Sequence, residues 1–416
     1  MNRVIVIGGG ASGMLAAIFS ANQNSNTILI DRMERVGRKL RITGKGRGNL
    51  TNIADVDEFM NNFPGNGRFL HSALNFFSNR DVMKFFENLG IELKIERGGR
   101  VFPKSDRAQD LVDALDSKLR DLNVEIHSKS RVIKILTESN RVTGVELHDG
   151  RKIFANRVIL ATGGKSYPAT GSTGDGYELA RYLGHSITPI LPSLIPLETV
   201  EDFVKDLQGL TLKNVRAKFN RHEEFGEMLF THFGISGPII LTLSRDVARS
   251  LSQKSPVTIS IDLKPALTFD QLENRILRDF SKFRRKTIRN GLTELLPMKL
   301  IPIILDVAKI DSNLQVDQIS QNSRRKLIET LKNFQLTIKS TRPIDEAIVT
   351  QGGIATKEIN PKTMESKIIH GLFFAGEVID IDGFTGGFNL QAAFSTGAVA
   401  GNFSGINNDR SEINDR

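Results

Sequence analysis

Apolar runs in the first part of the chain alternate with segments of helical composition. The run Val4–Ile7 ends in a cluster of glycines, residues 14–21 are rich in helix formers, and Asn26–Ile30 is again mostly apolar. Short apolar runs separated by helical segments are typical of parallel α/β sheets. The pattern therefore predicts a strand, a glycine turn, a helix and a second strand at the N-terminus.

The pattern changes twice along the chain. Up to about residue 190 it predicts helices at 81–89 and 106–122, antiparallel strands at 131–137, 141–147 and 152–154, and a buried strand at 158–161. From 192 it predicts β structure at 210–219, 227–230 and 257–263, and residues 269–334 are helical and strongly charged. After Pro343 the α/β pattern returns and ends in the glycine-rich segment 371–401.

These changes predict an α/β fold with a Rossmann-like core that an inserted subdomain interrupts. The predicted parts are 1–191 (first part of the core), 192–267 (inserted β-rich subdomain), 268–334 (inserted basic helical subdomain), 335–405 (return through the β-rich subdomain to the core) and 406–416 (disordered tail).

Composition narrows the chemistry. The 416 residues include no cysteine, which excludes disulfides, thiolate metal ligands and thiol catalysis by this chain. The seven histidines lie far apart, so we predict no metal site. No run approaches the ~20 apolar residues of a membrane span, and the chain opens directly into a strand without a signal segment. We therefore expect a cytoplasmic protein that does not enter the membrane; the sequence says nothing of its oligomeric state.

The glycines after the first strand form a dinucleotide motif. Gly8, Gly10 and Gly13 stand in a G-x-G-x-x-G frame, and Asp31 follows the second strand. Such a frame permits a tight turn, a close backbone approach to pyrophosphate and close helix–strand packing, and the acid accepts hydrogen bonds from ribose hydroxyls. A glycine-rich surface turn would not explain the acid. We expect the first helical amides and the residue after the acid to contribute as well: Ala11, Ser12 and Arg32.

Two later glycine elements favour FAD over NAD. Thr162, Gly163 and Gly164 follow a buried strand, and Gly376 and Glu377 follow another near the C-terminus. A third segment, Gly386, Gly387, Phe388 and Asn389, opens a helix of small residues whose dipole suits the reduced flavin. The alternative is a glycine-rich packing helix without a ligand. The remaining candidate cofactor contacts are Gly37, Lys39, Thr43, Gly44 and Val132.

The chain resembles the YhiN/BaiN-type flavoproteins, a bacterial family of NAD(P)/FAD-dependent oxidoreductases with a two-dinucleotide-binding-domain-like fold. The resemblance rests on residues 8–13, 37–52, 99–107, 231–238 and 371–387, of which 37–52 and 231–238 are specific to the family. It implies an FAD-binding core interrupted by a β-barrel-like piece and a small helical piece. It also implies NAD(P)H as a transient electron donor, because the chain has no second G-x-G-x-x-G frame after a strand.

One position departs from the family pattern. Where the family has Gly-Arg-Cys-Asn, this chain has Gly48 in place of the cysteine. A thiol role at this position is therefore excluded.

Candidates for the chemical step come from two segments. Lys45 and Asn49 follow the second strand and are expected to run along the flavin, and His232 is the candidate general acid because its ordinary pKa is near neutrality. The alternative for His232 is a place in the core. Arg47 is either a pyrophosphate or a surface contact. The basic cluster Arg100, Lys104 and Arg107 suits either an anionic ligand or a solvated loop.

The placement of positive charge separates the possible functions. The formal charge is +9, and besides the basic run 32–47 the helical insert carries Arg275, Arg278, Lys282, Arg284, Arg285, Lys286 and Arg289, with Arg324, Arg325 and Lys326 beyond. FAD does not account for these insert cations, which suit phosphate contacts with RNA, with Phe280 and Phe283 as stacking candidates. Members of the resembled family are linked to uridine reduction in ribosomal RNA or to steroid-like molecules. Reduction of ribosomal RNA uridine is therefore our first expectation. A small unsaturated substrate and a non-catalytic, FAD-stabilised interaction protein are the alternatives.

Overall fold

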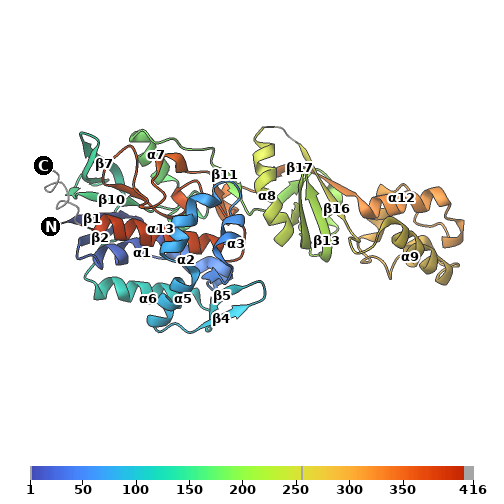
Figure 1. Ribbon diagram of the computed structural model, residues 1–416. Helices are drawn as coiled ribbons and strands as arrows, with labels where there is room; N and C mark the ends of the chain where they lie inside the picture. Colours follow the sequence, from blue (N-terminus) through green and yellow to red (C-terminus); the bar gives the residue numbers. More distant parts are fainter. Residues whose placement is uncertain (1, 254–255, 407–416) are drawn as a thin grey trace. The chain divides into compact units, whose positions relative to one another are not determined.

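The computed structural model describes residues 2–253 and 256–406 and divides into two compact units (Figure 1). Unit 1 comprises residues 1–191 and 348–416, and unit 2 comprises residues 192–347. Each unit has its own hydrophobic core. Of the predicted disordered tail, 406–416, only Ile406 lies within the described residues.

Unit 1 contains a parallel sheet, two small antiparallel sheets and the helices that cover them. Its elements are β1 (Arg3–Ile7), α1 (Ala11–Ala21), β2 (Asn26–Ile30), α2 (Arg38–Ile42), β3 (Thr51–Asn52), α3 (Val56–Asn61), α4 (His71–Phe76), α5 (Asn79–Asn88), β4 (Leu93–Glu96), β5 (Arg100–Pro103), α6 (Ala108–Asp121), β6 (Glu125–His127), β7 (Val132–Glu138), β8 (Arg141–Leu147), β9 (Lys152–Phe154), β10 (Arg157–Leu160), α7 (Asp175–Tyr182), β18 (Val349–Gln351), β19 (Leu372–Phe374) and α13 (Phe388–Gly405). The connecting strand β11 (Leu191–Ser193) lies at the end of its first part.

The parallel sheet has the strand order β19-β10-β1-β2-β6, and every neighbouring pair is parallel. Residues 4–7 and 27–30 are buried, because helices cover both faces of such a sheet. β19 is the direct neighbour of β10 although all of unit 2 separates them in sequence. The carboxyl ends of the strands therefore gather the glycine elements from both ends of the chain at one edge.

Helices α1 and α13 pack backbone against backbone (Figure 1). A Cβ atom added at Gly397 would lie 2.3 Å from the carbonyl oxygen of Ser12, and one at Gly401 would lie 2.2 Å from that of Ala16. Glycines four residues apart lie on one face of a helix, so they form a flat stripe that admits the neighbouring backbone. The small residues of the C-terminal helix thus serve close helix packing.

Unit 2 contains a closed six-stranded barrel and a helical piece. Its elements are β12 (Leu197–Thr199), β13 (Thr211–Phe219), β14 (His222–Phe230), β15 (Gly234–Ser236), α8 (Pro238–Leu251), β16 (Val257–Asp262), α9 (Phe269–Lys282), α10 (Ile288–Gly291), α11 (Ile301–Val307), α12 (Gln321–Lys332) and β17 (Phe334–Thr341).

The barrel has the order β12-β15-β14-β13-β16-β17, and α8 packs against strands from most of its circumference. Buried and exposed residues alternate along β13, as expected for a strand with one face in the barrel interior. Helices α9 to α12 occupy the stretch between β16 and β17, and Figure 1 shows α9 and α12 together beyond these strands. The predicted fold class, a Rossmann-like core with an inserted barrel-like subdomain and helical piece, is confirmed. Within the described part of the chain, no helix is both long and apolar enough to cross a membrane.

The glycine stripe predicts a sign reversal for a common stabilising substitution. Replacing glycine by alanine in a helix ordinarily stabilises it by about 0.5–1 kcal/mol. At Gly401 the new methyl group would meet the Ala16 carbonyl oxygen at 2.2 Å, so we expect Gly401→Ala to destabilise unit 1, by about 2 kcal/mol at the scale of overpacked cores. Thermal unfolding checks this.

The control is Asn402→Ala, which removes only an exposed hydrogen bond from Gln23. It is expected to cost less than about 1 kcal/mol. An unchanged or higher unfolding temperature for Gly401→Ala would contradict the packing described.

Candidate functional site

Each glycine of the N-terminal motif meets a different spatial requirement. Gly8 has a φ of 103°, and a Cβ there would lie 2.5 Å from the carbonyl oxygen of Ala161. A Cβ at Gly13 would lie 1.8 Å from the Gly8 carbonyl oxygen, whereas one at Gly10 meets no atom within 4 Å. Gly8 and Gly13 are therefore required by the protein's own packing, and Gly10 leaves backbone open to a ligand.

The start of α1 offers unused backbone donors. Gly10 caps the helix without any side-chain hydrogen bond, and its first turn, which includes Ala11 and Ser12, carries no acidic residue. The first amides of a helix lack intrahelical partners and attract anions. The positions predicted for pyrophosphate therefore have the donors that a pyrophosphate needs.

Asp31 is joined to the glycine turn. Its Oδ2 accepts a hydrogen bond from the amide of Gly9 at 2.6 Å, and its Oδ1 accepts one from Met33 at 2.6 Å. Burial raises the pKa of Asp31 above its ordinary value, although these two amides and the nearby Arg32 act in the opposite direction. Each carboxylate oxygen keeps a further lone pair, so the group can still accept from ribose hydroxyls.

The second and third glycine elements reach the first. A Cβ at Gly376 would lie 2.4 Å from the Ser12 hydroxyl oxygen, and the Gly8 turn touches Ala161 and Thr162. The Thr162 hydroxyl is buried and has no hydrogen-bond partner among the described residues. An open glycine, free helix amides and an unpaired buried hydroxyl around one turn fit an adenine dinucleotide such as FAD.

Lys39 and Glu377, predicted as separate cofactor contacts, form an ion pair at 2.7 Å. Ser166 joins them: it receives a hydrogen bond from Lys39 and donates one to Glu377 at 3.2 Å. Lys39 contacts Oε2 of Glu377, whereas the amide of Thr350 donates at 2.8 Å to Oε1, the oxygen that also accepts from Ser166. Both Glu377 oxygens are thus used within the protein, and the pair ties together the ends of β10, β18 and β19.

The ion pair also determines the charge state of Glu377. Burial pushes the pKa of Glu377 upward, but the charge and hydrogen bond of Lys39, together with Thr350, hold it below its ordinary value. The carboxylate therefore remains ionised at neutral pH.

The loop 43–49 has an unusual backbone. Gly44 and Lys45 are both left-handed, with φ of 58° and 59°, and the Lys45 side chain is exposed. This conformation is sparsely populated by non-glycine residues, and the residues that adopt it cluster at functional sites. The Thr43 hydroxyl donates to the Leu40 carbonyl, whereas the Asn49 Oδ1 is buried with no partner among the described residues. Lys45 and Asn49 are therefore the two predicted side chains of this loop left open to a ligand.

Gly48 packs closely against helix α6. It is buried with a φ of 75°, and a Cβ there would lie 2.9 Å from the Leu111 Cδ1 and 3.1 Å from the Ala108 Cα. The absence of the family's cysteine is thus accompanied by tight packing of α6 against this position.

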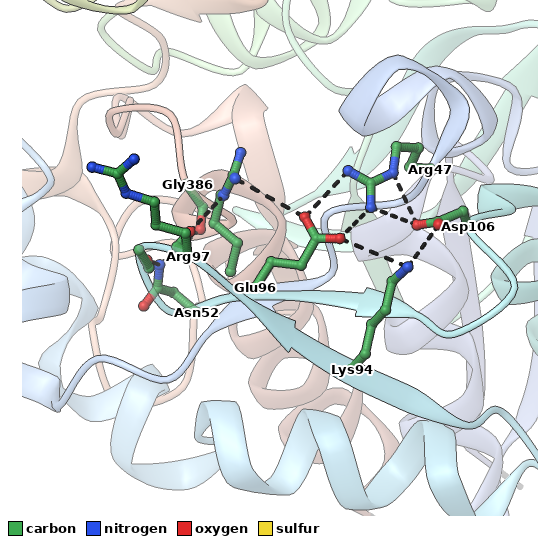
Figure 2. Close-up of polar contacts among 9 residues, drawn as sticks. Arg47, Asn52, Lys94, Glu96, Arg97, Asp106 and Gly386 are labelled. Carbon is green, nitrogen blue, oxygen red and sulfur yellow. Dashed lines mark hydrogen bonds and ion pairs between the residues drawn. The ribbon is translucent and has the colours of Figure 1, made fainter. Parts of the chain in front are cut away.

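An ion-pair network joins the loop 43–49 to the β4–β5 hairpin (Figure 2). Arg47 pairs with Glu96 and Asp106, and Lys94 pairs with Asp106 at 2.6 Å. Hydrogen bonds from Arg47 hold the pKa of Glu96 below its ordinary value. Of the two alternatives for Arg47, the structure shows the surface contact, because its guanidinium is paired with two carboxylates.

The predicted basic cluster in this region is neutralised. Lys104 pairs with Glu92 at 2.8 Å, Arg107 with Asp110 at 3.5 Å, and Arg100 with Glu96 at 4.0 Å. The cluster is therefore a set of exposed ion pairs, which agrees with the alternative of a solvated loop rather than with an anionic ligand.

The C-terminal glycine loop precedes α13. Gly387 caps the helix with a φ of 100°, and Phe388 packs edge-on against Phe59 at 5.0 Å. The Asn389 side chain accepts from the amide of Gly383 and donates to its carbonyl oxygen, so it shapes the loop internally. Of these predicted residues, Gly386 and Gly387 contribute backbone to the site.

Of three further predicted contacts, Gly37 lies against the first turn, whereas Arg32 and Val132 lie near α7. Gly37 donates its amide to the Gly9 carbonyl at 2.7 Å. The Arg32 guanidinium pairs with Asp175 at 3.1 Å, which ties it to the start of α7. Val132, at the start of β7, lines a groove of about 550 Å³ between β7 and α7. Gly163 and Gly164 are closely packed as well. A Cβ at Gly163 would lie 3.0 Å from the Ser172 hydroxyl oxygen, and one at Gly164 would lie 2.3 Å from the Thr350 hydroxyl oxygen and 2.7 Å from Glu377 Oε1.

His232 lies in unit 2, apart in the chain from every other predicted site residue. It occupies the turn between β14 and β15, its side chain is exposed, and its ring meets that of Phe233 edge-on at 4.9 Å. The alternative of a core histidine is therefore wrong. Its role as a general acid stays a prediction.

Sequence reasoning missed several residues of this site. A Cβ at Gly9 would lie 2.6 Å from Val36, and its amide holds Asp31. Thr350 bridges Glu377 and the amides of Lys165 and Ser166, and Gln351 beside it is buried with neither end of its carboxamide paired among the described residues. The glycine pair 352–353 directly after the buried strand Val349–Gln351 was the available signal, since a glycine pair also follows a strand at 163–164.

Comparison with known proteins agrees with a flavin-dependent class. The profile described as HI0933-like protein Rossmann domain matches residues 2–403. The chain is 35% identical over 408 residues to the 3-dehydro-bile acid delta(4,6)-reductase of Clostridium scindens, covering 96% of this chain and 98% of that protein. It is 30% identical over 397 residues to the ribosomal RNA dihydrouridine synthase of Escherichia coli K12, covering 94% and 95%.

A solved structure shares the fold. The 3-ketosteroid-delta4-(5alpha)-dehydrogenase of Rhodococcus jostii RHA1 aligns with a TM-score of 0.53 at 15% identity, covering 98% of this chain and 97% of that one. At this identity the likeness shows the fold alone.

The chain therefore belongs to the class of FAD-dependent oxidoreductases with a Rossmann-like core. Within that class it is a member of the HI0933-like family, the YhiN/BaiN-type flavoproteins that the sequence resembles. The predicted family, cofactor FAD and enzyme class are confirmed. The alternative of a non-catalytic protein is wrong.

The Lys39–Glu377 pair predicts a pH-dependent loss of stability. Because the folded-state pKa of Glu377 is lowered, its contribution is present above the ordinary value of 4.5 and is lost as the pH falls through the lower folded value. At neutral pH we expect Glu377→Gln to cost about 2 kcal/mol, because it leaves the Lys39 ammonium without its carboxylate. The difference in the free energy of unfolding between the variant and the unmutated protein should become smaller as the pH falls below 4.5.

Urea unfolding at neutral and acid pH, with the same excess of FAD throughout, measures both quantities. The control is Glu178→Gln, whose exposed pair with Arg181 is expected to contribute less than about 1 kcal/mol. A pH-independent gap for Glu377→Gln would show that the pair does not hold the carboxylate ionised.

Proposed function

We propose that this enzyme reduces a uridine base in RNA, with ribosomal RNA as the first expected substrate and NAD(P)H as the electron donor. In the overall reaction one hydride from NAD(P)H and one proton add across the C5=C6 bond of the uracil ring, giving dihydrouridine and NAD(P)⁺. FAD, when bound, supplies hydride transfer at its N5 atom. The name of the Escherichia coli relative supports this choice.

A basic surface on the helical piece of unit 2 carries the proposal. Residues 264–332 contain fourteen Lys and Arg against eight Asp and Glu, so this segment supplies most of the chain's net charge of +9. Seven of its exposed cations have no acidic partner among the described residues: Arg278, Arg285, Lys286, Arg289, Lys299, Lys309 and Lys326. Cations that protein carboxylates do not neutralise remain available to phosphates.

An aromatic ring lies within this surface. Phe283 is half-buried, and the ammonium groups of Lys282 and Lys286 lie 5.0 Å and 4.7 Å from the centre of its ring. A ring flanked by cations suits a stacked base between phosphate contacts. The expectation that Phe280 stacks on a base is wrong, because its side chain is 7% exposed and belongs to the core of unit 2.

The open residues of the loop 43–49 are proposed to act on the substrate. The exposed Lys45 ammonium can hold an oxygen of the base, and the unpaired Asn49 carboxamide oxygen can accept a hydrogen bond from its N–H group. His232 is retained as the proposed proton source, since its side chain is exposed.

A small unsaturated molecule is the second candidate substrate. It is favoured by the 35% identity with a protein named as a bile acid reductase. Such a substrate makes no use of the basic surface, so the two candidates differ in what that surface does.

Salt-dependent RNA binding tests the surface directly. We expect the affinity for ribosomal RNA fragments to fall steeply with salt. The triple substitution Arg285→Ala, Lys286→Ala, Arg289→Ala should flatten the log–log slope by about 2, the value for three lost single-strand phosphate contacts. The control removes three exposed cations from β13 (Lys213→Ala, Arg216→Ala, Lys218→Ala) and should leave the slope nearly unchanged. Equal effects of both triples would mean that binding is non-specific and would contradict the proposal.

Nucleoside analysis then identifies the substrate. Digested ribosomal RNA from cells with and without the gene is compared by mass spectrometry. We expect dihydrouridine to disappear from at least one position without the gene and to return with the unmutated gene. Unchanged nucleosides, together with NAD(P)H-driven reduction of an unsaturated steroid by the purified holoenzyme, would replace RNA with the small-molecule candidate.

A further inference from the structure

The short strand β3 holds the glycine loop at the start of α13. A Cβ at Gly387 would lie 2.3 Å from the Thr51 carbonyl oxygen, so the loop rests directly on this strand. The Thr51 hydroxyl donates to the side chain of Gln391 in α13 at 2.5 Å, and both residues are buried. The position of the loop is therefore set by β3, which ends the family-specific segment 37–52.

The Asn52 side chain hydrogen-bonds to Gly386, the first glycine of this pair (Figure 2). It is 5% exposed, and its Nδ2 donates to the Gly386 carbonyl oxygen at 3.0 Å and to the Gly98 carbonyl oxygen at 2.9 Å. Its Oδ1 accepts from the Ala54 amide at 3.0 Å. All the hydrogen-bonding groups of one buried side chain thus join β3, the β4–β5 turn and the glycine loop.

The bond to Gly386 fixes the direction of the following amide. In a trans peptide the carbonyl and the N–H of one unit point in opposite directions. The Gly386 carbonyl points at Asn52, so the N–H of Gly387 points away from it, and no described residue accepts that N–H. Gly386 and Gly387 have φ of 135° and 100°. Because glycine restricts its backbone less than any other residue, a peptide between two glycines rotates easily unless another group holds it.

The same side chain is linked to the loop 43–49. The β4–β5 turn that Asn52 holds through Gly98 belongs to the hairpin whose Glu96 pairs with Arg47. One hairpin therefore connects the loop 43–49 with the glycine loop at the start of α13, and Asn52 is its link to the latter.

We propose that Asn52 is a positioning residue that sets the reduction potential of the bound flavin. It acts by orienting the Gly386–Gly387 peptide, so that the Gly387 N–H and the first amides of α13 face the charge of the reduced cofactor. This inference rests on the proposed placement of the flavin at the glycine loop and is independent of the substrate.

Replacement by aspartate tests the orientation most directly. In Asn52→Asp the second carboxyl oxygen would face two carbonyl oxygens instead of donating to them, so the loop turns away and a negative charge is added. We expect reduced flavin to lose about tenfold more affinity than oxidised flavin, which for two electrons lowers the midpoint potential by about 30 mV. Asn52→Ala should shift the potential in the same direction by less. Reductive titration of the holoenzyme against dyes of known potential measures both.

The pH profile separates orientation from a general loss of structure. Protonation of the carboxyl introduced in Asn52→Asp restores a donor toward the Gly386 carbonyl. The difference in potential from the unmutated enzyme should therefore shrink as the pH falls, a change that a loosened fold does not produce.

Asn79→Ala is the matched control. Asn79 donates to the carbonyl oxygens of Asn52 and Ala54 at 2.7 Å and 2.8 Å, so it stabilises the same segment without touching Gly386. We expect it to lower the unfolding temperature and leave the potential unchanged.

An unaltered potential in both Asn52 variants, or an equal shift in Asn79→Ala, would overturn the proposal and leave Asn52 with a structural role only. Because the titration uses no substrate, a failure of RNA reduction leaves its result intact. Failure of the unmutated protein to bind FAD at all would overturn both the flavin placement and this inference.

Discussion

The cofactor site depends on one contact, the backbone-to-backbone approach of α1 and α13. Gly397 and Gly401 leave no atom between the α13 backbone and the carbonyl oxygens of Ser12 and Ala16. α1 begins at the N-terminal glycine turn and α13 begins at the C-terminal glycine loop. Because the contact involves backbone, side-chain rearrangement cannot adjust it, and both helix N-termini are held in register. The two ends of the chain therefore form a single site.

Much of this site could be predicted because its requirements are local. The close packing of Gly13 against the Gly8 carbonyl and the open backbone at Gly10 depend on residues a few positions away, so spacing alone reveals them, whereas the contact of Gly8 with Ala161 does not follow from spacing. The pairing of Lys39 with Glu377 could not be predicted, because it is created by a sheet in which β19 joins β10 across the whole of unit 2. Local patterns carry no information on which distant side chains meet.

Which cations are free to bind anions could not be predicted from the sequence either. Arg47 and the neighbouring cations of the hairpin looked as available to anions as those of the helical insert, yet the former are paired with Glu96, Asp106 and other acids. The difference lies in which carboxylates the fold brings near, and a list of residues does not contain it. Phe280 and Phe283 make the same point, since Phe280 in α9 is buried, whereas Phe283, just past the end of that helix, is only half-buried.

The order of elements along the chain has a consequence for biosynthesis. Unit 2 is one contiguous segment with its own core, whereas the parallel sheet of unit 1 gains β19, and its glycine turn gains α13, only from the last part of the chain. Domains fold as units during translation, so the barrel can form while the nucleotide-binding half is still incomplete on the ribosome. The surface of α1 that packs on α13 is therefore uncovered until α13 has been made, and the paired helix N-termini of the cofactor site form only after residues 388–405 have been synthesised.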